Sequence, residues 1–232
     1  MIKAITFDLD DTLWAIEPVI VKANQQMLDW MHKHAPKFSE TYDDQGISQL
    51  RDEAFANNPH MLHDLSHIRL CLIEMGLSRC GYKNATELAK KAFAVYFEGR
   101  NKVELFPDAQ SQLKALKKEF MIGALTNGNA DLEKVGLDHL FDFYYNSAQL
   151  GVSKPTPKFF ETAINRAQCP ASQFIHIGDH PEHDIAGAKA VGMNTIWMNP
   201  HHLAWPSHLT KPDGEIHHLN QLTKTVAKIN AK

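Results

Sequence analysis

The amino-acid sequence predicts an α/β protein with a doubly wound parallel sheet, interrupted by an all-helical insert. Three observations support this prediction. A short apolar run near the N-terminus has the length of a buried strand, and residues 103–232 alternate short apolar runs with helix patterns, as chains with parallel sheets do. Residues 15–102, between these parts, show helical periodicity only. Because 232 residues leave room for one or two domains, we expect a core of residues 1–14 plus 103–232 and an inserted domain of residues 15–102.

The first predicted strand covers the largely apolar residues 4–9 and ends among acidic side chains. Asp8, Asp10 and Asp11 follow one another closely, and Thr12 comes directly after them. Carboxylates crowded at the end of a buried strand repel one another, and a divalent cation with oxygen ligands would offset that repulsion. The alternative is a surface turn in which the same side chains act as turn and cap residues. Taken alone, this segment supports both interpretations equally.

The insert is expected to form four helices and no strand. Glu87 stands three residues after the expected N-cap Asn84, which predicts a capping box at the start of the fourth helix. The methionine and aromatic stripes of these helices indicate core packing rather than cofactor contacts. Apolar residues recur at helical spacing in residues 16–31 (ended by Pro36), 48–55, 61–75 (closed by Gly76) and 84–99.

The C-terminal part alternates helices with strands. The predicted strands are residues 120–125, 141–145, 174–177 and 195–198, the last being the final strand of the sheet. The predicted helices are residues 109–118, 156–167 and 182–191, with a short one near residues 132–135. The tail from Asn199 is expected to be a loop that leads to a short amphipathic helix at residues 219–229.

Polar side chains follow the strands of the predicted sheet. The carboxyl ends of parallel strands share one edge, so these side chains should converge. Taken singly, each has an ordinary explanation as a turn residue, a helix cap or a solvated lysine. Taken together, they predict one pocket with carboxylates for a cation and with a lysine, a hydroxyl and amides for phosphate oxygens. The residues of this predicted pocket are Asp8, Asp10, Thr126, Asn127, Lys154, Asp179 and Asp184.

Four motifs occur in the order that they have in a known family. They are FDLDDTL at residues 7–13, LTNGN at 125–129, Lys154 within SKPTPKFF, and IGDHPEHDIAGAKAVGM at 177–193. With these motifs the chain resembles the haloacid dehalogenase superfamily, most of whose members are phosphatases. The resemblance implies a Rossmann-like core, and the insert is placed as the helical type 1 cap is in that family. Among its members, the chain is similar to those that act on flavin mononucleotide and related phosphorylated flavin precursors.

The resemblance also assigns roles in a reaction. Asp8 would be the nucleophile that takes the phosphoryl group as an aspartyl phosphate. Asp10 would protonate the leaving oxygen and then activate water, for which a raised pKa suits it. Thr126, Asn127 and Lys154 would hold the oxygens of the phosphoryl group.

A metal site is implied by the same resemblance. Asp179 would bind Mg²⁺ together with the Asp8 carboxylate and the Asp10 backbone carbonyl. Asp184 would lie outside the direct ligands and orient Lys154 or a water on the metal. Because a phosphate ester is a dianion, an anionic nucleophile needs such positive charge beside it.

Asp10 separates the reactions known in the superfamily. Its dehalogenases lack a second aspartate there, because a halide leaving group needs no proton, so Asp10 favours phosphate chemistry. The implied function is hydrolysis of a small phosphorylated metabolite, with flavin mononucleotide, sugar phosphates and nucleotides as candidates and the cap setting the choice. Two alternatives stay open: a non-catalytic member that binds a ligand or protein, and a dehalogenase or phosphonate-cleaving hydrolase.

Trp14 is expected to line the pocket entrance or to be a core or hinge residue.

Composition limits the partners. The net charge of −3 and the absence of a basic stripe argue against nucleic acid, and no apolar run approaches the ~20 residues of a membrane helix. Cys71, Cys80 and Cys169 share no metal-ligand spacing and are expected to be reduced thiols in a cytoplasmic protein. His63 and His67, four residues apart, and the histidines of the tail are interpreted as surface residues. The sequence specifies no oligomeric state.

Overall fold

The computed structural model describes residues 1–231, and the chain divides into two compact units. The first unit contains residues Met1–Ala15, Glu104–Gly128 and the chain from Gly136 onward. The second unit contains Ile16–Val103 together with Asn129–Val135. Among the described residues, no helix combines the length and the apolar character needed to span a bilayer.

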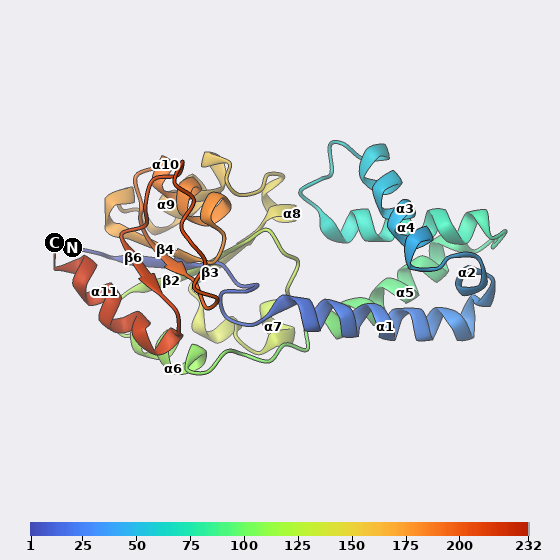
Figure 1. Cartoon of the computed structure of the whole chain (residues 1–232), viewed down its shortest axis with the longest axis horizontal. Helices are drawn as coiled ribbons and strands as arrows, with labels where there is room; N and C mark the ends of the chain where they lie inside the picture. The colour runs from blue at the N-terminus through green and yellow to red at the C-terminus, as the bar shows by residue number, and fades with distance from the viewer. Residues whose placement is uncertain (232) are drawn as a thin grey trace. The chain divides into compact units, whose positions relative to one another are not determined.

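The first unit is built on a sheet of six parallel strands in the order β3-β2-β1-β4-β5-β6 (Figure 1). This confirms the predicted α/β fold. All four residues of β1 are buried, as expected for a strand with covered faces on both sides. The strands are β1 (Ala4–Phe7), β2 (Met121–Thr126), β3 (Phe143–Asn146), β4 (Phe174–Gly178), β5 (Asn194–Met198) and β6 (Gly214–Ile216).

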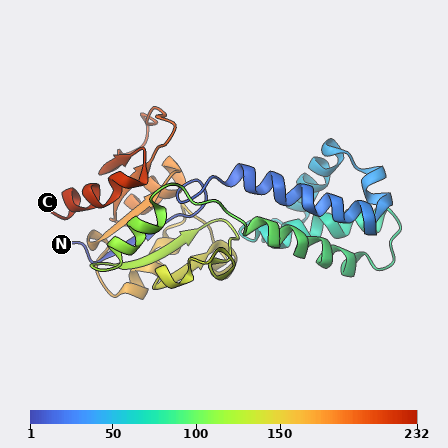
Figure 2. The same ribbon diagram turned by 90° about the horizontal axis from the view of Figure 1, so that it is seen from below.

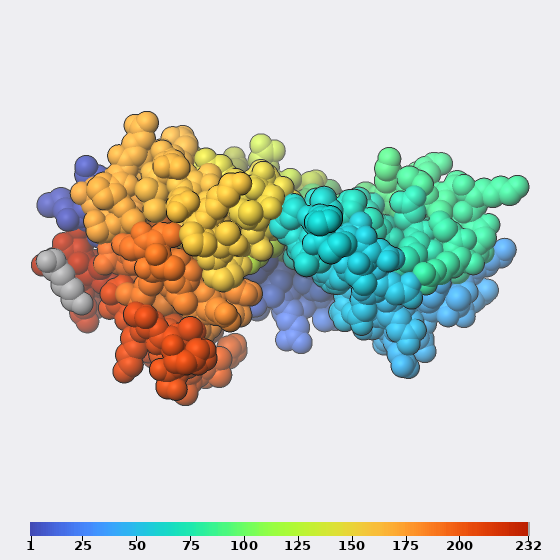
Figure 3. All heavy atoms as spheres, turned by 90° about the horizontal axis from the view of Figure 1, so that it is seen from above, coloured from blue at the N-terminus to red at the C-terminus, as the bar shows by residue number. Residues whose placement is uncertain are grey.

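Helices cover both faces of this sheet. Figure 1 shows α9 (Pro157–Ala167) and α10 (Gly187–Ala190) on one face, and Figure 3 shows their side chains covering it. Figure 2 shows α6 (Ala109–Leu116) and α11 (Leu222–Asn230) on the opposite face. A single turn, α8 (Ser147–Leu150), follows β3 directly. Coverage on both faces explains why β1 and β4 are buried along their whole length.

The order of the strands fixes where a site can form. From β1 the chain builds β2 and β3 on one side and β4 to β6 on the other. Phe7 at the end of β1 pairs with Ala124 of β2 and with Ile177 of β4. The residues that follow β1 and β4 therefore leave the sheet side by side, at the position where parallel sheets bind ligands.

The second unit is helical throughout its described elements, as predicted. Its helices are α1 (Ile16–His34), α2 (Pro36–Thr41), α3 (Asp44–Asn57), α4 (Leu65–Arg79), α5 (Ala85–Arg100) and α7 (Leu132–Val135). One apolar core joins α1, α3, α4 and α5. The side chains of Asp43 and Asp64 cap α3 and α4, whereas Asn84 makes no side-chain cap bond, so the predicted capping box is wrong. Pro36 begins α2 in addition to following α1, because proline fits a first helical turn.

The polar segment Asn129–Val135 also belongs to the second unit. The Asn129 amide donates to Ser66 Oγ at 3.0 Å, and the Asp131 N–H donates to the Asn101 side chain at 2.7 Å. These are side-chain contacts between distant segments, which helical periodicity does not reveal.

Two further details of the first unit differ from the prediction. The final strand is β6 in the tail, not β5; it is three residues long, with only Ile216 buried, which is too short for an apolar pattern. Asp213 anchors it by accepting from the Thr195 N–H at 2.8 Å. The predicted helix at 182–191 is instead a π-helical turn, Pro181–Ala186, followed by α10.

Candidate active site

Lys154 is the centre of the site. Its ammonium donates to Asp8 Oδ1 at 2.6 Å, to Asp184 Oδ1 at 2.6 Å and to the Leu125 carbonyl at 2.8 Å. An ammonium has three protons, so these bonds use all of them. Lys154 is only 4% exposed, and its position between two carboxylates is therefore fixed by charge and by hydrogen bonds.

Thr126, the last residue of β2, and Asn127, the residue after it, contribute polar side chains to the site. Asn127 Oδ1 accepts from the Lys154 N–H at 2.8 Å, and its Nδ2 donates to the Lys154 carbonyl at 3.0 Å. The Asn127 side chain therefore positions the lysine backbone. The Thr126 hydroxyl accepts from the Gly128 N–H at 2.9 Å, which leaves its own proton for an anion.

Asp184 anchors the other side of the lysine. Its Oδ2 accepts from the His180 N–H at 3.0 Å, while Oδ1 receives Lys154. The wide π-helical turn brings this carboxylate back over the end of β4, where Gly178 lies. A Cβ on Gly178 would stand 2.3 Å from Asp184 Cγ, so only glycine leaves room for the carboxylate.

His176 supports Asp184 from within the sheet, a contact that the sequence analysis did not find. It is fully buried on β4, with Nε2 3.2 Å from Asp184 Oδ1 and Nδ1 2.9 Å from the Thr6 hydroxyl. Burial lowers the pKa of His176 despite the nearby Asp184, so the ring is neutral at pH 7. The only available signal was one histidine within the apolar run of β4.

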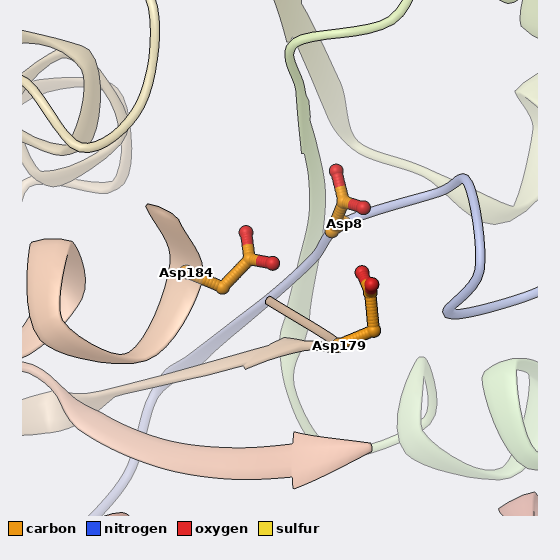
Figure 4. A group of neighbouring side chains, drawn as sticks. All are labelled: Asp8, Asp179 and Asp184. Carbon is orange, nitrogen blue, oxygen red and sulfur yellow. The ribbon is translucent and has the colours of Figure 1, made fainter. Parts of the chain in front are cut away.

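Three carboxylates share one space beside the lysine. Each of Asp8, Asp179 and Asp184 offers an oxygen within 4.8 Å of the others, and Figure 4 shows the three side chains turned toward one another. Asp179 Oδ1 also accepts from the Thr12 hydroxyl at 3.3 Å. Because both oxygens of Asp184 already accept protein donors, Asp8 and Asp179 are better placed to act as direct ligands.

The electrostatics of this cluster fit a hard divalent cation. Burial raises the pKa of Asp8 to about 7, although the Lys154 ammonium opposes the rise. Burial raises the pKa of Asp179 to about 8, and the charges of Asp184 and Asp8 add to it. Burial would lower the pKa of Lys154, but Asp184 and Asp8 hold it above its usual range. One ammonium thus faces three carboxylates, an excess of negative charge that a cation bound by oxygen ligands would neutralise.

Asp10 lies two residues beyond Asp8. Its Oδ1 accepts from the Trp14 indole N–H at 2.8 Å, and Trp14 is completely buried. Of the two expectations for Trp14, the buried position agrees with a core residue and not with one lining an entrance. Asp11, between these two residues, has a left-handed backbone with φ of 56°, which tightens the turn after β1.

The fold and this cluster define an α/β protein with a carboxylate and lysine site at the switch point of a parallel sheet. The family model of haloacid dehalogenase-like hydrolases matches residues 2–192, so the chain belongs to that family.

Curated relatives of the chain include phosphatases. It is 29% identical over 231 residues to the 5-amino-6-(5-phospho-D-ribitylamino)uracil phosphatase YigB of Escherichia coli, covering 97% of this chain and 96% of that protein. It is 30% identical over 205 residues to the glyceraldehyde 3-phosphate phosphatase of Pyrococcus furiosus, covering 85% and 80% of the two chains.

A solved structure resembles the chain along almost its whole length. The crystal structure of a 2-haloacid dehalogenase from Pseudomonas syringae pv. Tomato is 40% identical, with a TM-score of 0.94 and coverage of 98% of this chain and 99% of that one. The relatives therefore carry names from two reaction classes, and the choice between them depends on the site.

Proposed function

We propose that this protein is a Mg²⁺-dependent phosphatase that hydrolyses the phosphate monoester of a small metabolite through an aspartyl phosphate. The observation that carries this proposal is the pair of carboxylates after β1. Asp8 is held by Lys154 at 2.6 Å, and Asp10 stands two residues further on with a fixed side chain. One can serve as nucleophile and the other as acid and base.

The first chemical step transfers the phosphoryl group to the protein. An Asp8 carboxylate oxygen forms a bond to phosphorus while the ester P–O bond breaks, and the Asp10 carboxyl gives its proton to the departing alkoxide. In the second step Asp10, now ionised, takes a proton from water, whose oxygen attacks phosphorus and releases phosphate and the free Asp8 carboxylate. The Thr126 hydroxyl is suited to donate to a phosphoryl oxygen, and the Lys154 ammonium, whose protons are held by Asp8, Asp184 and the Leu125 carbonyl, contributes positive charge beside it.

The carboxylates suggest how the metal would be held. Asp8 and Asp179 would bind Mg²⁺ through side-chain oxygens and Asp10 through its backbone carbonyl, with Asp184 orienting Lys154. When bound, the ion supplies positive charge that lets an anionic nucleophile approach an anionic ester.

The second candidate is a dehalogenase, which the name of the 40% identical structure favours. A halide leaves as a stable anion and takes no proton, whereas an alkoxide requires one. Asp10 has a role in phosphate hydrolysis and none in carbon–halogen cleavage. This difference, together with the phosphatase relatives, is why we favour a phosphatase.

The purified protein is expected to release phosphate from p-nitrophenyl phosphate only with Mg²⁺, and to release no chloride from 2-chloropropionate. The two assays distinguish the alternatives. Chloride release without phosphate release would assign a dehalogenase, and neither product would assign a non-catalytic member.

The substrate is to be sought among small phosphate esters. A useful panel contains flavin mononucleotide, 5-amino-6-(5-phospho-D-ribitylamino)uracil and glyceraldehyde 3-phosphate, together with sugar phosphates and nucleotides. The second and third compounds appear in the names of relatives of this chain.

The three cysteines are free thiols. We propose on this ground that the protein works in the reducing cytoplasm.

Mg²⁺ is expected to stabilise the protein more at pH 8.5 than at pH 5.5. The pKa values of Asp8 and Asp179 are raised to about 7 and about 8. At pH values between the ordinary aspartate pKa of 3.8 and these raised pKa values, the folded state binds more protons than the unfolded state. The stability of the metal-free protein therefore falls as the pH rises through this range. At pH 8.5 the ionised pair can bind the cation; at pH 5.5 protons compete with it.

Thermal melting with and without Mg²⁺ at the two pH values measures this effect. At a concentration of 100 times its dissociation constant, Mg²⁺ should raise Tm at pH 8.5 by roughly 5 °C. In the Asp179→Asn variant the difference between the two pH values should shrink. An equal rise in Tm at both pH values in the unmodified protein would contradict the assignment of these carboxylates.

A further inference from the structure

Trp14 is fixed beside Asp10 by its backbone as well as by its indole. Its backbone pairs with Asp10 on one side and with Leu105 on the other, and its carbonyl accepts from the Asp11 N–H at 2.7 Å. The side chain is fully buried, and its Nε1 donates to Asp10 Oδ1 at 2.8 Å. A large, rigid side chain with an anchored backbone thus holds one oxygen of the Asp10 carboxyl.

The indole can only donate a hydrogen bond, and it has no acceptor. The Asp10 oxygen that it contacts must therefore be an acceptor, both when the carboxyl is ionised and when it is protonated. A proton on Oδ1 would weaken that oxygen as an acceptor for the indole N–H, so the hydrogen bond favours the acid proton on Oδ2. The indole consequently selects which oxygen of Asp10 carries the proton.

We propose that Trp14 is a positioning residue that presents Asp10 Oδ2 as the proton donor to the leaving oxygen. This inference rests on the phosphatase function proposed above and names a residue outside the predicted pocket. Without the indole N–H, Oδ1 loses the donor that favours the proton on Oδ2, so the fraction of molecules ready for proton transfer falls. Substrates whose leaving group needs the proton lose the most.

The test is the Trp14→Phe variant, which keeps an aromatic ring in the core and removes the N–H. Its kcat/KM is measured on p-nitrophenyl phosphate, phenyl phosphate and p-methylphenyl phosphate, whose leaving phenolates increase in basicity in that order. Because kcat/KM includes the step in which the phenolate departs, it reports on the proton donor. General acids contribute about 10²–10⁴-fold. We therefore expect kcat/KM to fall by about 10-fold or more on the two esters with basic leaving groups and by less than about 3-fold on p-nitrophenyl phosphate.

Trp205→Phe is the matched control. Trp205 lies in the same unit, and its indole N–H donates to the Leu209 carbonyl at 3.1 Å, so the variant loses one bond of the same kind away from Asp10. Its kcat/KM should fall by less than about 3-fold on all three esters. A loss in Trp14→Phe that is equal on all three esters would mean a purely structural role and would overturn the proposal.

A spectroscopic readout tests the hydrogen bond without activity. In the ¹H–¹⁵N NMR spectrum of ¹⁵N-labelled protein, the Trp14 indole signal is the one missing in Trp14→Phe. If Trp14→Phe does not fold, the signal is assigned by elimination, with phenylalanine variants of the other tryptophans. The signal should move upfield in Asp10→Ala, which removes the acceptor, and an unmoved signal would overturn the proposal. If the unmodified protein hydrolyses none of the esters, the phosphatase function fails instead, a result distinct from either outcome.

Discussion

The Asp8→Asn variant is expected to lose turnover by about 10⁴-fold or more while it keeps its folded structure. An amide oxygen is a far weaker nucleophile than a carboxylate, so the phosphoryl group has no acceptor in the protein. The fold persists because asparagine has nearly the same shape and its side-chain oxygen can still accept from Lys154, as Asp8 Oδ1 does at 2.6 Å.

The stability of this variant adds a second readout. Burial raises the pKa of Asp8 to about 7, so at pH 8 the ionised carboxylate opposes folding in the absence of metal. Asparagine removes that charge, and the Tm of Asp8→Asn without Mg²⁺ at pH 8 should equal or exceed that of the unmodified protein. A mutation that damaged the core would lower it instead.

Asp108→Asn serves as the control for the same chemical change. Asp108 is exposed, makes no cap bond with its side chain and has a left-handed backbone with φ of 67°, a conformation that asparagine adopts readily. Its turnover should match the unmodified protein. If Asp8→Asn kept more than about 1% of the activity, the nucleophile would have to be another residue.

The position of the site followed from the sequence because a parallel sheet leaves little freedom. Once the strands of an α/β chain are located, their carboxyl ends must share an edge, and the structure does bring Asp8, Lys154, Asp179 and Asp184 together there. The roles of these residues remain predictions, since convergence in space does not identify a reaction.

The supporting residues could not be found in this way because their contacts join segments far apart in the chain. His176 reads as one polar interruption of an apolar strand, and its contacts with Thr6 and Asp184 appear only when β1, β4 and the π-helical turn are assembled. The Asn127 side chain is a similar case. It holds the backbone of Lys154 through two hydrogen bonds, while its predicted contact with phosphate stays a prediction.

The Lys154→Met variant is expected to lower the free energy of unfolding by about 3–5 kcal/mol, because it leaves two buried carboxylates without their counter-ion. Methionine fills a similar volume without a charge, so the loss reports on electrostatics rather than on a cavity. Burial alone would raise the pKa of Asp184, but Lys154 and the hydrogen bond from His176 hold it below its usual range. Removing the ammonium removes the main opposing influence.

The pH dependence of this loss identifies its cause. Without Lys154 the pKa values of Asp8 and Asp184 rise. At pH 5 both carboxyl groups are then protonated in the folded state, so the penalty for burying their charge is smaller than at pH 8. Urea denaturation followed by tryptophan fluorescence should therefore show a larger loss at pH 8 than at pH 5. Added Mg²⁺ should restore part of the stability at pH 8, because it supplies positive charge to the same carboxylates.

Lys91→Met is the matched control for Lys154→Met. Lys91 and Glu87 form an ion pair of 2.6 Å, the same separation as in the buried pairs, but their side chains are 58% and 63% exposed. Water screens such a pair, so its loss should cost far less stability than the loss of Lys154 at either pH. Equal losses from the two lysine variants would mean that burial adds nothing to the Lys154 ion pairs. The negative charge on Asp8 would then have to be balanced by the metal alone.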